Sequence, residues 1–191
     1  MAVDGLFLRT ATAQDVRELL AIYAPYVTDT AVTFEYEVPS EGEFARRILE
    51  TLETYPFLVV QDEGKTLGYA YATAFKNRAA YDWSVQTSIY LRMEERQKGI
   101  GRVLYNALEA ALKRQNVQNL YACIAYAKCE DDRLSNASEA FHTRMGYQKI
   151  GHFTSCGYKF GTWYDMIWME KMLGEHPETP ETFLPYSMFS R

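Results

Sequence analysis

The segment Arg96–Arg102, with the sequence RQKGIGR, places basic side chains and two glycines directly before a long run of apolar residues at helical spacing. The first turn of a helix leaves about four backbone N–H groups without intrahelical acceptors and carries positive dipole charge. Gly99 and Gly101 would let an anion approach this backbone closely. A surface helix cap with scattered basic residues is the alternative. The strand–loop–helix context and the R-x-x-G-x-G spacing favour a loop that binds a diphosphate.

Two common phosphate motifs are missing from the chain. There is no G-x-x-x-x-G-K-[ST] sequence, so a P-loop is not expected. The third glycine of G-x-G-x-x-G is also missing, which argues against a dinucleotide-binding fold. The loop at residues 96–102 must therefore serve a different phosphate ligand.

The elements around this loop follow from turn signals and hydrophobic periodicity. A capping pair, Ser40 and Glu43, predicts one helix, and Pro25 is expected to end or kink an earlier one. We expect strands at residues 6–9, 82–91, 119–127, 147–154 and 164–171, and a two-stranded hairpin over 57–75. We expect four helices: one after Thr12, one after Ser40, one over 101–115, and one from Ser135 or Asn136 to Gly146. An antiparallel meander followed by a strand–helix–strand unit predicts one mixed sheet with helices on its faces. We expect one domain over residues 1–173 and a proline-rich tail over 174–191.

Composition narrows the class of protein. The formal net charge of -5 over 191 residues argues against general nucleic-acid binding, which needs a basic face. Apolar runs are too short to cross a membrane, and the N-terminus has no basic leader region. Three cysteines without paired metal spacing indicate reduced thiols and no metal site. A cytoplasmic protein that binds neither membrane nor nucleic acid is the expectation.

Three further segments carry a family resemblance: NRAAYDWSVQTSIYL (77–91), NASEAFHTRMGY (136–147) and CGYKFGTWYDMIWMEK (156–171). Together with the R-x-x-G-x-G loop they resemble the GNAT superfamily of N-acetyltransferases, and among them the phosphinothricin and methionine sulfoximine acetyltransferases. The resemblance covers about Arg9 to Met172. It implies an α/β (α+β) GNAT fold, a single mixed, splayed sheet with helices on both faces. It also implies a homodimer and direct acetyl transfer from acetyl-CoA to a small amine, without a covalent enzyme intermediate.

The same resemblance implies which residues contact acetyl-CoA. Main-chain groups would bind the pantetheine arm from one strand, and the glycine loop would bind the pyrophosphate. The expected residues are Ser88, Ile89, Tyr90, Arg96, Gln97, Lys98, Gly99, Ile100, Gly101 and Arg102. The family's N-x-x-S motif is altered, because Ser135 stands where the asparagine is usual and Asn136 follows one residue later. Ser135 and Asn136 are candidate contacts at this position.

The general base is the main departure from the relatives. Alternation along the strand places Gln86 on a polar face with Ser88 and Tyr90. The relatives carry a glutamate at the position of Gln86, and an amide cannot accept a proton at neutral pH. Gln86 could still orient a water or a substrate group. Glu35 is a substitute candidate, with a solvated strand-edge carboxylate as the alternative; a water chain or an already neutral amine are the others.

His142 and the substrate contacts complete the candidate set. His142 stands four residues before Gly146, where the superfamily often has a tyrosine acid. It could protonate the leaving thiolate, or it could pack on its helix without reacting. Arg78 could hold a substrate carboxylate, with Tyr81 and Phe34 as aromatic neighbours, although a loop arginine and core aromatics are the plainer interpretations.

Two other functions stay open. Gln86 in place of an acid would suit an acyl-CoA-binding module with attenuated catalysis. Transfer to peptide N-termini, polyamines or aminoglycosides is the other, and the acidic stretch CEDD at 129–132 hints at a polycation.

Overall fold

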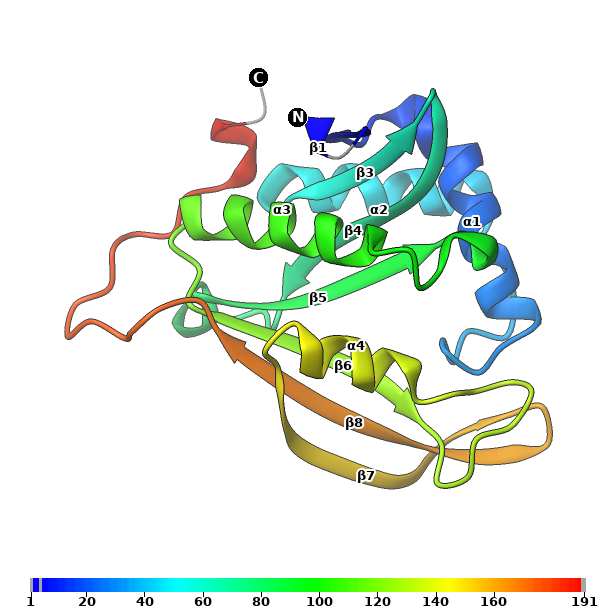
Figure 1. Ribbon diagram of the computed structural model, residues 1–191. Coiled ribbons are helices and arrows are strands. Elements are labelled where there is room, and N and C mark those ends of the chain that lie inside the picture. Colours follow the sequence, from blue (N-terminus) through cyan, green and yellow to red (C-terminus); the bar gives the residue numbers. More distant parts are fainter. Residues whose placement is uncertain (1, 4, 190–191) are drawn as a thin grey trace. The chain divides into compact units, whose positions relative to one another are not determined.

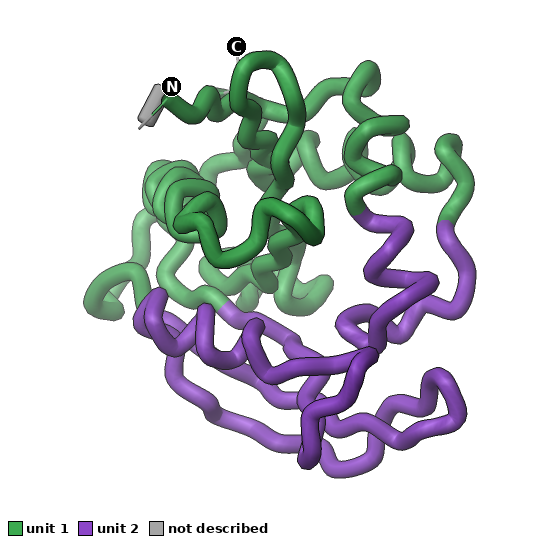
Figure 2. Tube along the Cα trace, turned by 45° about the vertical axis from the view of Figure 1, so that its right-hand side comes forward, with its two compact units in different colours: residues 1–22, 39–120, 172–191 green, residues 23–38, 121–171 purple. Residues whose placement is uncertain are grey.

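The computed structural model describes residues 2–3 and 5–189. The chain divides into two compact units (Figure 2). Unit 1 comprises residues 1–22, 39–120 and 172–191, and unit 2 comprises residues 23–38 and 121–171. Helix α1 (Val16–Thr28) and strand β6 (Asn119–Tyr126) contribute residues to both units.

Unit 1 contains an antiparallel meander, as predicted. Its elements are β1 (Ala2–Val3), β2 (Leu6–Thr10), β3 (Phe57–Asp62), β4 (Lys65–Ala74), β5 (Ser84–Leu91), α2 (Glu41–Thr54), α3 (Ile100–Arg114) and the short 3₁₀ turns η1 (Ala13–Asp15), η2 (Ala79–Tyr81), η3 (Met93–Glu95) and η4 (Tyr186–Met188). Each strand from β1 to β5 pairs with the next one in the chain. Glu63 and Gly64 close the β3–β4 hairpin with φ values of 45° and 83°. Both values lie in the left-handed region that a two-residue hairpin turn requires.

Helices cover both faces of this meander (Figure 1). On one face Tyr105 of α3 donates a hydrogen bond to Oγ1 of Thr87 on β5 (3.3 Å). On the other face Phe44 of α2 packs edge-on against Tyr69 of β4, with ring centroids 6.3 Å apart. Tyr69 pairs directly with Tyr90, whose side chain points away from that of Thr87 because strand residues alternate. The Ser40 hydroxyl accepts a hydrogen bond from the Glu43 amide at the start of α2, which confirms Ser40 as the N-cap. The Glu43 carboxylate instead bonds Arg46 and Arg47.

Unit 2 is built on a long hairpin, β7 (Gln148–Lys159) and β8 (Thr162–Met172), together with β6 and the short helix α4 (Ala137–Arg144). In this unit the strand order is β6–β8–β7, and β7 and β8 are antiparallel. Phe160 and Gly161 form the turn with positive φ values. The sequence predicted two shorter strands here. The pairing of β7 with β8 is irregular between Phe153 and Gly157, and this irregularity interrupts the alternation of side chains. The sequence pattern therefore did not show that β7 continues to Lys159.

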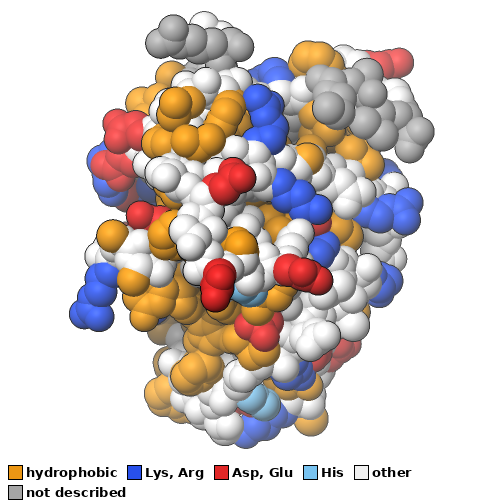
Figure 3. All heavy atoms as spheres, turned by 90° about the vertical axis from the view of Figure 1, so that its left-hand side faces the viewer, with side chains coloured by type: hydrophobic (Ala, Val, Ile, Leu, Met, Phe, Trp, Pro, Cys, Tyr) orange, Lys and Arg blue, Asp and Glu red, His pale blue; other side chains and the backbone are white. Residues whose placement is uncertain are grey.

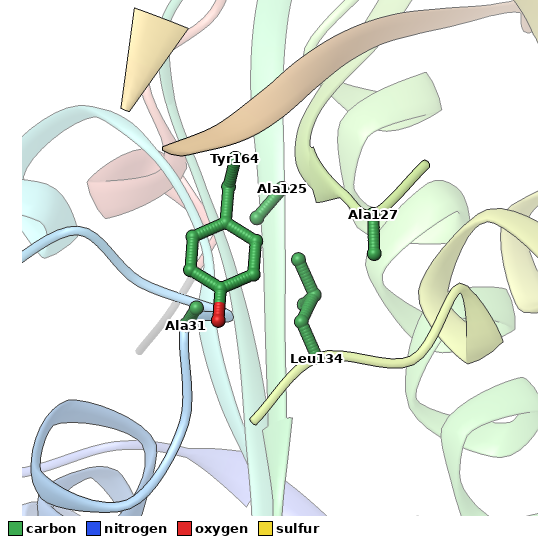
Figure 4. Packing of buried hydrophobic residues seen from close by; sticks show 5 residues of the cluster. All are labelled: Ala31, Ala125, Ala127, Leu134 and Tyr164. Carbon is green, nitrogen blue, oxygen red and sulfur yellow. The ribbon is translucent and has the colours of Figure 1, made fainter. Parts of the chain in front are cut away.

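The core of unit 2 gathers small side chains around one aromatic ring (Figure 4). Ala31, Ala125, Ala127, Leu134 and Tyr164 form this buried cluster. They come from the loop after α1, from the end of β6, from the loop before α4 and from β8. The loop after α1 is therefore anchored in the unit through Ala31, which is fully buried.

Pro25 does not end α1, which continues to Thr28. A proline lacks the N–H that would bond one turn back, so the helix passes through this position with one fewer internal hydrogen bond. The expectation that Pro25 ends the helix is thus wrong, although the helix does end within one further turn.

The C-terminal tail is bound to unit 1 by side chains that meet its backbone. Gln115 donates from Nε2 to the carbonyl of Leu184 (2.9 Å), whose amide donates back to the Gln115 carbonyl (3.1 Å). Asn116 Nδ2 donates to the carbonyl of Thr182 (2.8 Å), and Trp83 Nε1 donates to that of Glu181 (2.7 Å). The side chains of the tail pack as well: the rings of Phe183 and Tyr55 lie 5.6 Å apart.

Charged side chains of both signs lie among hydrophobic ones on the face shown in Figure 3. Neither sign dominates this face. No helix among the described residues is both long enough and apolar enough to span a membrane.

Candidate functional site

The glycine loop leads from β5 into α3 in unit 1. After η3, Gln97 and Gly99 adopt positive φ values of 63° and 83°. Gly99 is the N-cap of α3, and no side chain caps the helix. The helical pattern begins with the amides of Arg102 and Val103, which donate to the Gly99 carbonyl at 3.0 and 3.3 Å. The amides before Arg102 belong to the first turn, for which the helix itself supplies no acceptor.

The loop is also open in space. A Cβ built on Gly99 would meet no atom within 4 Å. Residues 96–99 are exposed, whereas Ile100 and Gly101 are buried. Ile100 thus anchors the helix start in the core, and its contribution to an anion site is limited to its backbone. The left-handed backbone at Gln97 and Gly99 and the uncapped start of α3 leave room for the anion that the sequence predicts here, and the binding itself stays a prediction.

One of the basic residues at the rim of this loop, Lys98, has an acidic partner. Lys98 Nζ lies 2.9 Å from Glu95 Oε2, and Lys65 Nζ lies 3.6 Å from Glu95 Oε1. The hydrogen bond from Lys98 lowers the pKa of Glu95. A diphosphate at the loop would compete with Glu95 for the Lys98 ammonium.

Strand β5 carries the polar row that the sequence predicts. Gln86, Ser88 and Tyr90 pair directly with Thr73, Tyr71 and Tyr69 of β4, in a register without a bulge. All three are half-buried, and the rings of Tyr90 and Tyr69 lie 5.4 Å apart. Ile89, between Ser88 and Tyr90, points to the opposite face of the strand and pairs with Ala70 of β4. Gln86, Ser88 and Tyr90 thus share one face of the strand, next to Thr73 and two tyrosines of β4.

Arg78 and Tyr81 lie at the other end of β5, in and next to η2. Both are exposed, and the Tyr81 amide donates to the Arg78 carbonyl (2.8 Å). The Tyr81 ring packs edge-on against Phe75, with centroids 5.7 Å apart. The short turn holds Tyr81 in place and leaves the Arg78 guanidinium at the surface.

Phe34 and Glu35 lie in the irregular loop of unit 2. Phe34 packs against the backbone of β7 at Gly157, where an added Cβ would clash with the Phe34 ring. Tyr36 donates from its hydroxyl to the carbonyl of Tyr158. Both contacts hold the loop on the tip of the β7–β8 hairpin.

Lys159 of the same hairpin lies beneath this loop. Its side chain is 2% exposed, and Nζ donates to the carbonyls of Thr30 (2.9 Å) and Thr33 (2.8 Å). Burial lowers the pKa of Lys159, while the charge of Glu35 acts in the opposite direction. Glu35 therefore has a buried cation in its vicinity.

His142 is buried in α4, with 3% of its surface exposed. Nδ1 lies 2.7 Å from the carbonyl of Ser138, and the rings of Phe141 and Tyr147 lie edge-on to the imidazole. Burial lowers the pKa of His142 to about 4. The imidazole is neutral at pH 7 in this environment.

Asn136 is the N-terminal flank of α4 but does not cap it with its side chain. The side-chain amide instead pairs with the backbone of Ala127: Oδ1 accepts from its amide (3.0 Å) and Nδ2 donates to its carbonyl (2.9 Å). Ser135 is exposed beside it. The asparagine therefore joins the end of β6 to the start of α4.

Two residues near Glu35 escaped the sequence argument, namely Gly157 and Lys159. The segment that holds them looked like a turn between two short strands. A signal was present, since a lysine at the closing position of a tight hairpin can turn inward, but nothing local shows that its acceptors lie more than 120 residues earlier. Among residues 2–3 and 5–189, no cluster of three or more His, Cys, Asp or Glu side chains could hold a metal ion.

Comparisons with known proteins agree with this geometry. Residues 8–168 match the family described as "Acetyltransferase (GNAT) domain". A phosphinothricin N-acetyltransferase of Alcaligenes faecalis is 32% identical over 167 residues, which are 87% of this chain and 82% of that protein. An L-methionine sulfoximine/L-methionine sulfone acetyltransferase of Pseudomonas paraeruginosa is 30% identical over 175 residues, covering 91% of this chain and 98% of its own.

A solved structure is also similar. A GNAT superfamily phosphinothricin acetyltransferase from Sinorhizobium meliloti, in complex with AcCoA, superposes with a TM-score of 0.84 at 34% sequence identity. The superposition covers 95% of this chain and 98% of the other. The two chains share the α/β fold, with its mixed, open sheet, over nearly their whole length.

Proposed function

Because the chain belongs to the GNAT acetyltransferase family, we propose that it moves the acetyl group of acetyl-CoA to the primary amine of a small amino-acid analogue. Acetyl transfer to an amine, with acetyl-CoA as co-substrate, is the activity of its family. The amino-acid analogue is the proposed part, and the names of the relatives at about 30% identity support it. One observation carries the proposal: α3 starts at Gly99 in the left-handed region, open and without a side-chain cap.

The glycine loop fits the diphosphate of coenzyme A. Residues Gln97 to Gly101 would hold it with backbone amides, and Lys98 and Arg102 would add charge at the rim. Main-chain groups of Ser88, Ile89 and Tyr90 would bind the pantetheine arm. The bound co-substrate supplies an activated thioester, so the protein itself needs no covalent intermediate.

The chain's own residues must bind the amine and manage its protons. In this proposal Glu35 accepts the proton of the amine, and Gln86 orients a water or the amine through its amide. The neutral imidazole of His142, which donates from Nδ1 to Ser138, has a supporting role in α4. Another donor would then protonate the leaving thiolate.

The proposed substrate contacts are Arg78, Tyr81 and Phe34. The exposed guanidinium of Arg78 could bind a carboxylate with two parallel hydrogen bonds. Tyr81, fixed on Phe75, and Phe34, seated on Gly157, are aromatic surfaces for the rest of an amino-acid side chain. The exposed guanidinium of Arg78 suits an amine that carries a carboxylate better than it suits a polycation.

A homodimer is the proposed assembly. Strand β7 is the outermost strand of unit 2, and its hairpin exposes large apolar side chains. These are Ile150, Phe153, Tyr158, Phe160 and Trp163. A second copy pairing along β7 would cover both an open strand edge and these side chains. Sedimentation of the wild type and of Phe153→Ser would test this; a wild type that stays monomeric at micromolar concentration would refute it.

We also propose that the domain spans residues 1–173, with 174–191 as an extension, and that the protein works in the cytoplasm without binding nucleic acid or membrane. The three cysteines are free thiols, which suits a reducing compartment. The acidic balance, with a net charge of -5, disfavours a polyanionic partner.

An amine panel tests the function. Phosphinothricin, methionine sulfoximine and methionine sulfone would be compared with a dipeptide, spermidine and an aminoglycoside, all with acetyl-CoA. Product should be followed by mass spectrometry, because the exposed thiols of the protein would react with thiol dyes. Transfer to the first group supports the proposal. Transfer only to spermidine, the dipeptide or the aminoglycoside would overturn the substrate class, and transfer to none would overturn the activity.

A further inference from the structure

We propose that Lys159 is a positioning residue, which fixes the loop that carries Phe34 and Glu35 and thereby sets the affinity for the amine. The inference rests on the proposed function, because it assigns a role within that same site. It concerns a residue that lies outside the acetyl-CoA loop and far from it in sequence.

The ammonium of Lys159 ties two turns of the loop together. Its N–H groups donate to the carbonyls of Thr30 and Thr33, three residues apart, at 2.9 and 2.8 Å. A buried charge is costly unless its hydrogen bonds are made. The 2% exposure of Lys159 therefore requires these two carbonyls to remain where they are, and the loop cannot open there without leaving the charge unbonded.

The anchor itself is stiff. Lys159 and Thr162 are the last pair before the two-residue turn of the β7–β8 hairpin. Phe160 stands next to the lysine, and its ring lies 5.1 Å from Nζ. The guanidinium of Arg133 also packs on this ring, at 4.6 Å from its centroid, and its Nη1 donates to the carbonyl of Asp29 (3.0 Å).

Phe34 and Glu35 lie between two tied points. Thr33 is bound to Lys159, and Tyr36 is bound to the carbonyl of Tyr158. The Phe34 ring rests on Gly157, where no side chain intervenes. The geometry thus fixes the backbone on both sides of the proposed base and the position of the aromatic contact.

The first test is Lys159→Met, which keeps the bulk of the side chain and removes the ammonium. The amine KM should rise about tenfold, since small displacements at a site of this kind are costly, while the acetyl-CoA KM stays within about twofold. An unchanged amine KM in a folded variant would overturn the proposal. An equal rise in both KM values would overturn it too, because that pattern marks general loosening.

A second variant decides the matter if Lys159→Met does not fold. Gly157→Ala places a methyl group against the Phe34 ring and leaves the lysine bonds in place. It should raise the amine KM and spare the acetyl-CoA KM. Gly151→Ala is the matched control on the same strand, since its Cβ would lie 3.6 Å from Phe153, at ordinary contact distance. Equal amine KM values for the two variants would count against the proposal.

Hydrogen exchange separates this inference from the proposed function. Amides 31–36 should exchange faster in Lys159→Met than in the wild type, whichever amine is the substrate. If the wild type acetylates no amine in the panel, the proposed function fails. Unchanged exchange at residues 31–36 would instead contradict the proposed role of Lys159 in fixing this loop.

Discussion

Nδ1 of His142 lies 2.7 Å from the carbonyl oxygen of Ser138, one helical turn earlier in α4. A carbonyl can only accept a hydrogen bond, so Nδ1 carries the proton of the neutral imidazole. The burial that lowers the pKa of His142 to about 4 disfavours a second proton at Nε2. The histidine is therefore better suited to hold α4 against Tyr147 than to donate a proton near pH 7.

The first prediction concerns stability and pH. The unfolded chain takes up a proton on His142 near the ordinary histidine pKa of 6.5, whereas the folded chain does so only near pH 4. The unfolded state binds more protons in this window, so stability falls as the pH is lowered from 6.5 to about 4. His142 would contribute a loss on the order of 3 kcal/mol. Urea unfolding at several pH values should show a flatter profile for His142→Gln than for the wild type.

The second prediction uses two glycines with the same backbone conformation. Gly99 and Gly64 both have φ values of 83°, and neither would crowd an added Cβ. Alanine at either position should cost about 1 kcal/mol of stability through backbone strain. Only Gly99→Ala should weaken acetyl-CoA binding, by about tenfold, as measured by calorimetry. Equal affinities in the two variants would show that the glycine loop does not bind the co-substrate.

The third prediction addresses Gln86. A carboxylate in its place, on the polar face of β5 opposite Thr73, could accept the proton of the amine. Because Glu35 is the proposed base, Gln86→Glu should leave kcat nearly unchanged at pH 8, and a rise of about 10²-fold would show that the wild type lacks an efficient base. Acetyl-CoA affinity should not change, and Gln86→Met serves as a control for the loss of the amide. A slower Gln86→Glu enzyme would mean that the amide itself has a part in the reaction.

The fourth prediction concerns the tail. A chain that ends at Leu173 loses the partners of Trp83, Gln115 and Asn116. The four hydrogen bonds to these partners, of about 1 kcal/mol each, would disappear, so thermal unfolding should shift to clearly lower temperature. The exposed serine at 187, bonded to the Glu53 carbonyl, offers a mild control, because Ser187→Ala should be nearly neutral. An unchanged melting temperature after truncation would show that the tail does not stabilise unit 1.

The sequence predicts the features that depend on local chemistry. The glycine loop could be placed because Gly99 and Gly101 mark a helix start, and α3 begins directly after Gly99. The polar row of Gln86 and Ser88 followed from strand alternation, since no bulge interrupts the β4–β5 register. The β3–β4 hairpin could be predicted because a short turn with Gly64 separates two apolar runs.

Features that depend on distant contacts could not be predicted. Lys159 lies outside the strands predicted from the sequence, and nothing local shows that its acceptors are Thr30 and Thr33. His142 reads as a candidate acid, and only the packing of Tyr147 and Phe141 shows that its charge is suppressed. Pro25 normally stops a helix, yet Tyr26 and Val27 are buried and their burial favours one more turn.

The fluorescence of Trp83 can report whether the C-terminal tail is bound. Its indole nitrogen is bonded to the carbonyl of Glu181, so departure of the tail would exchange a fixed acceptor for bulk water. With Trp163 and Trp168 replaced by phenylalanine, the remaining tryptophan emission would report the attachment of residues 181–189 by itself. Fraying of this end could then be followed in solution before the rest of the chain unfolds.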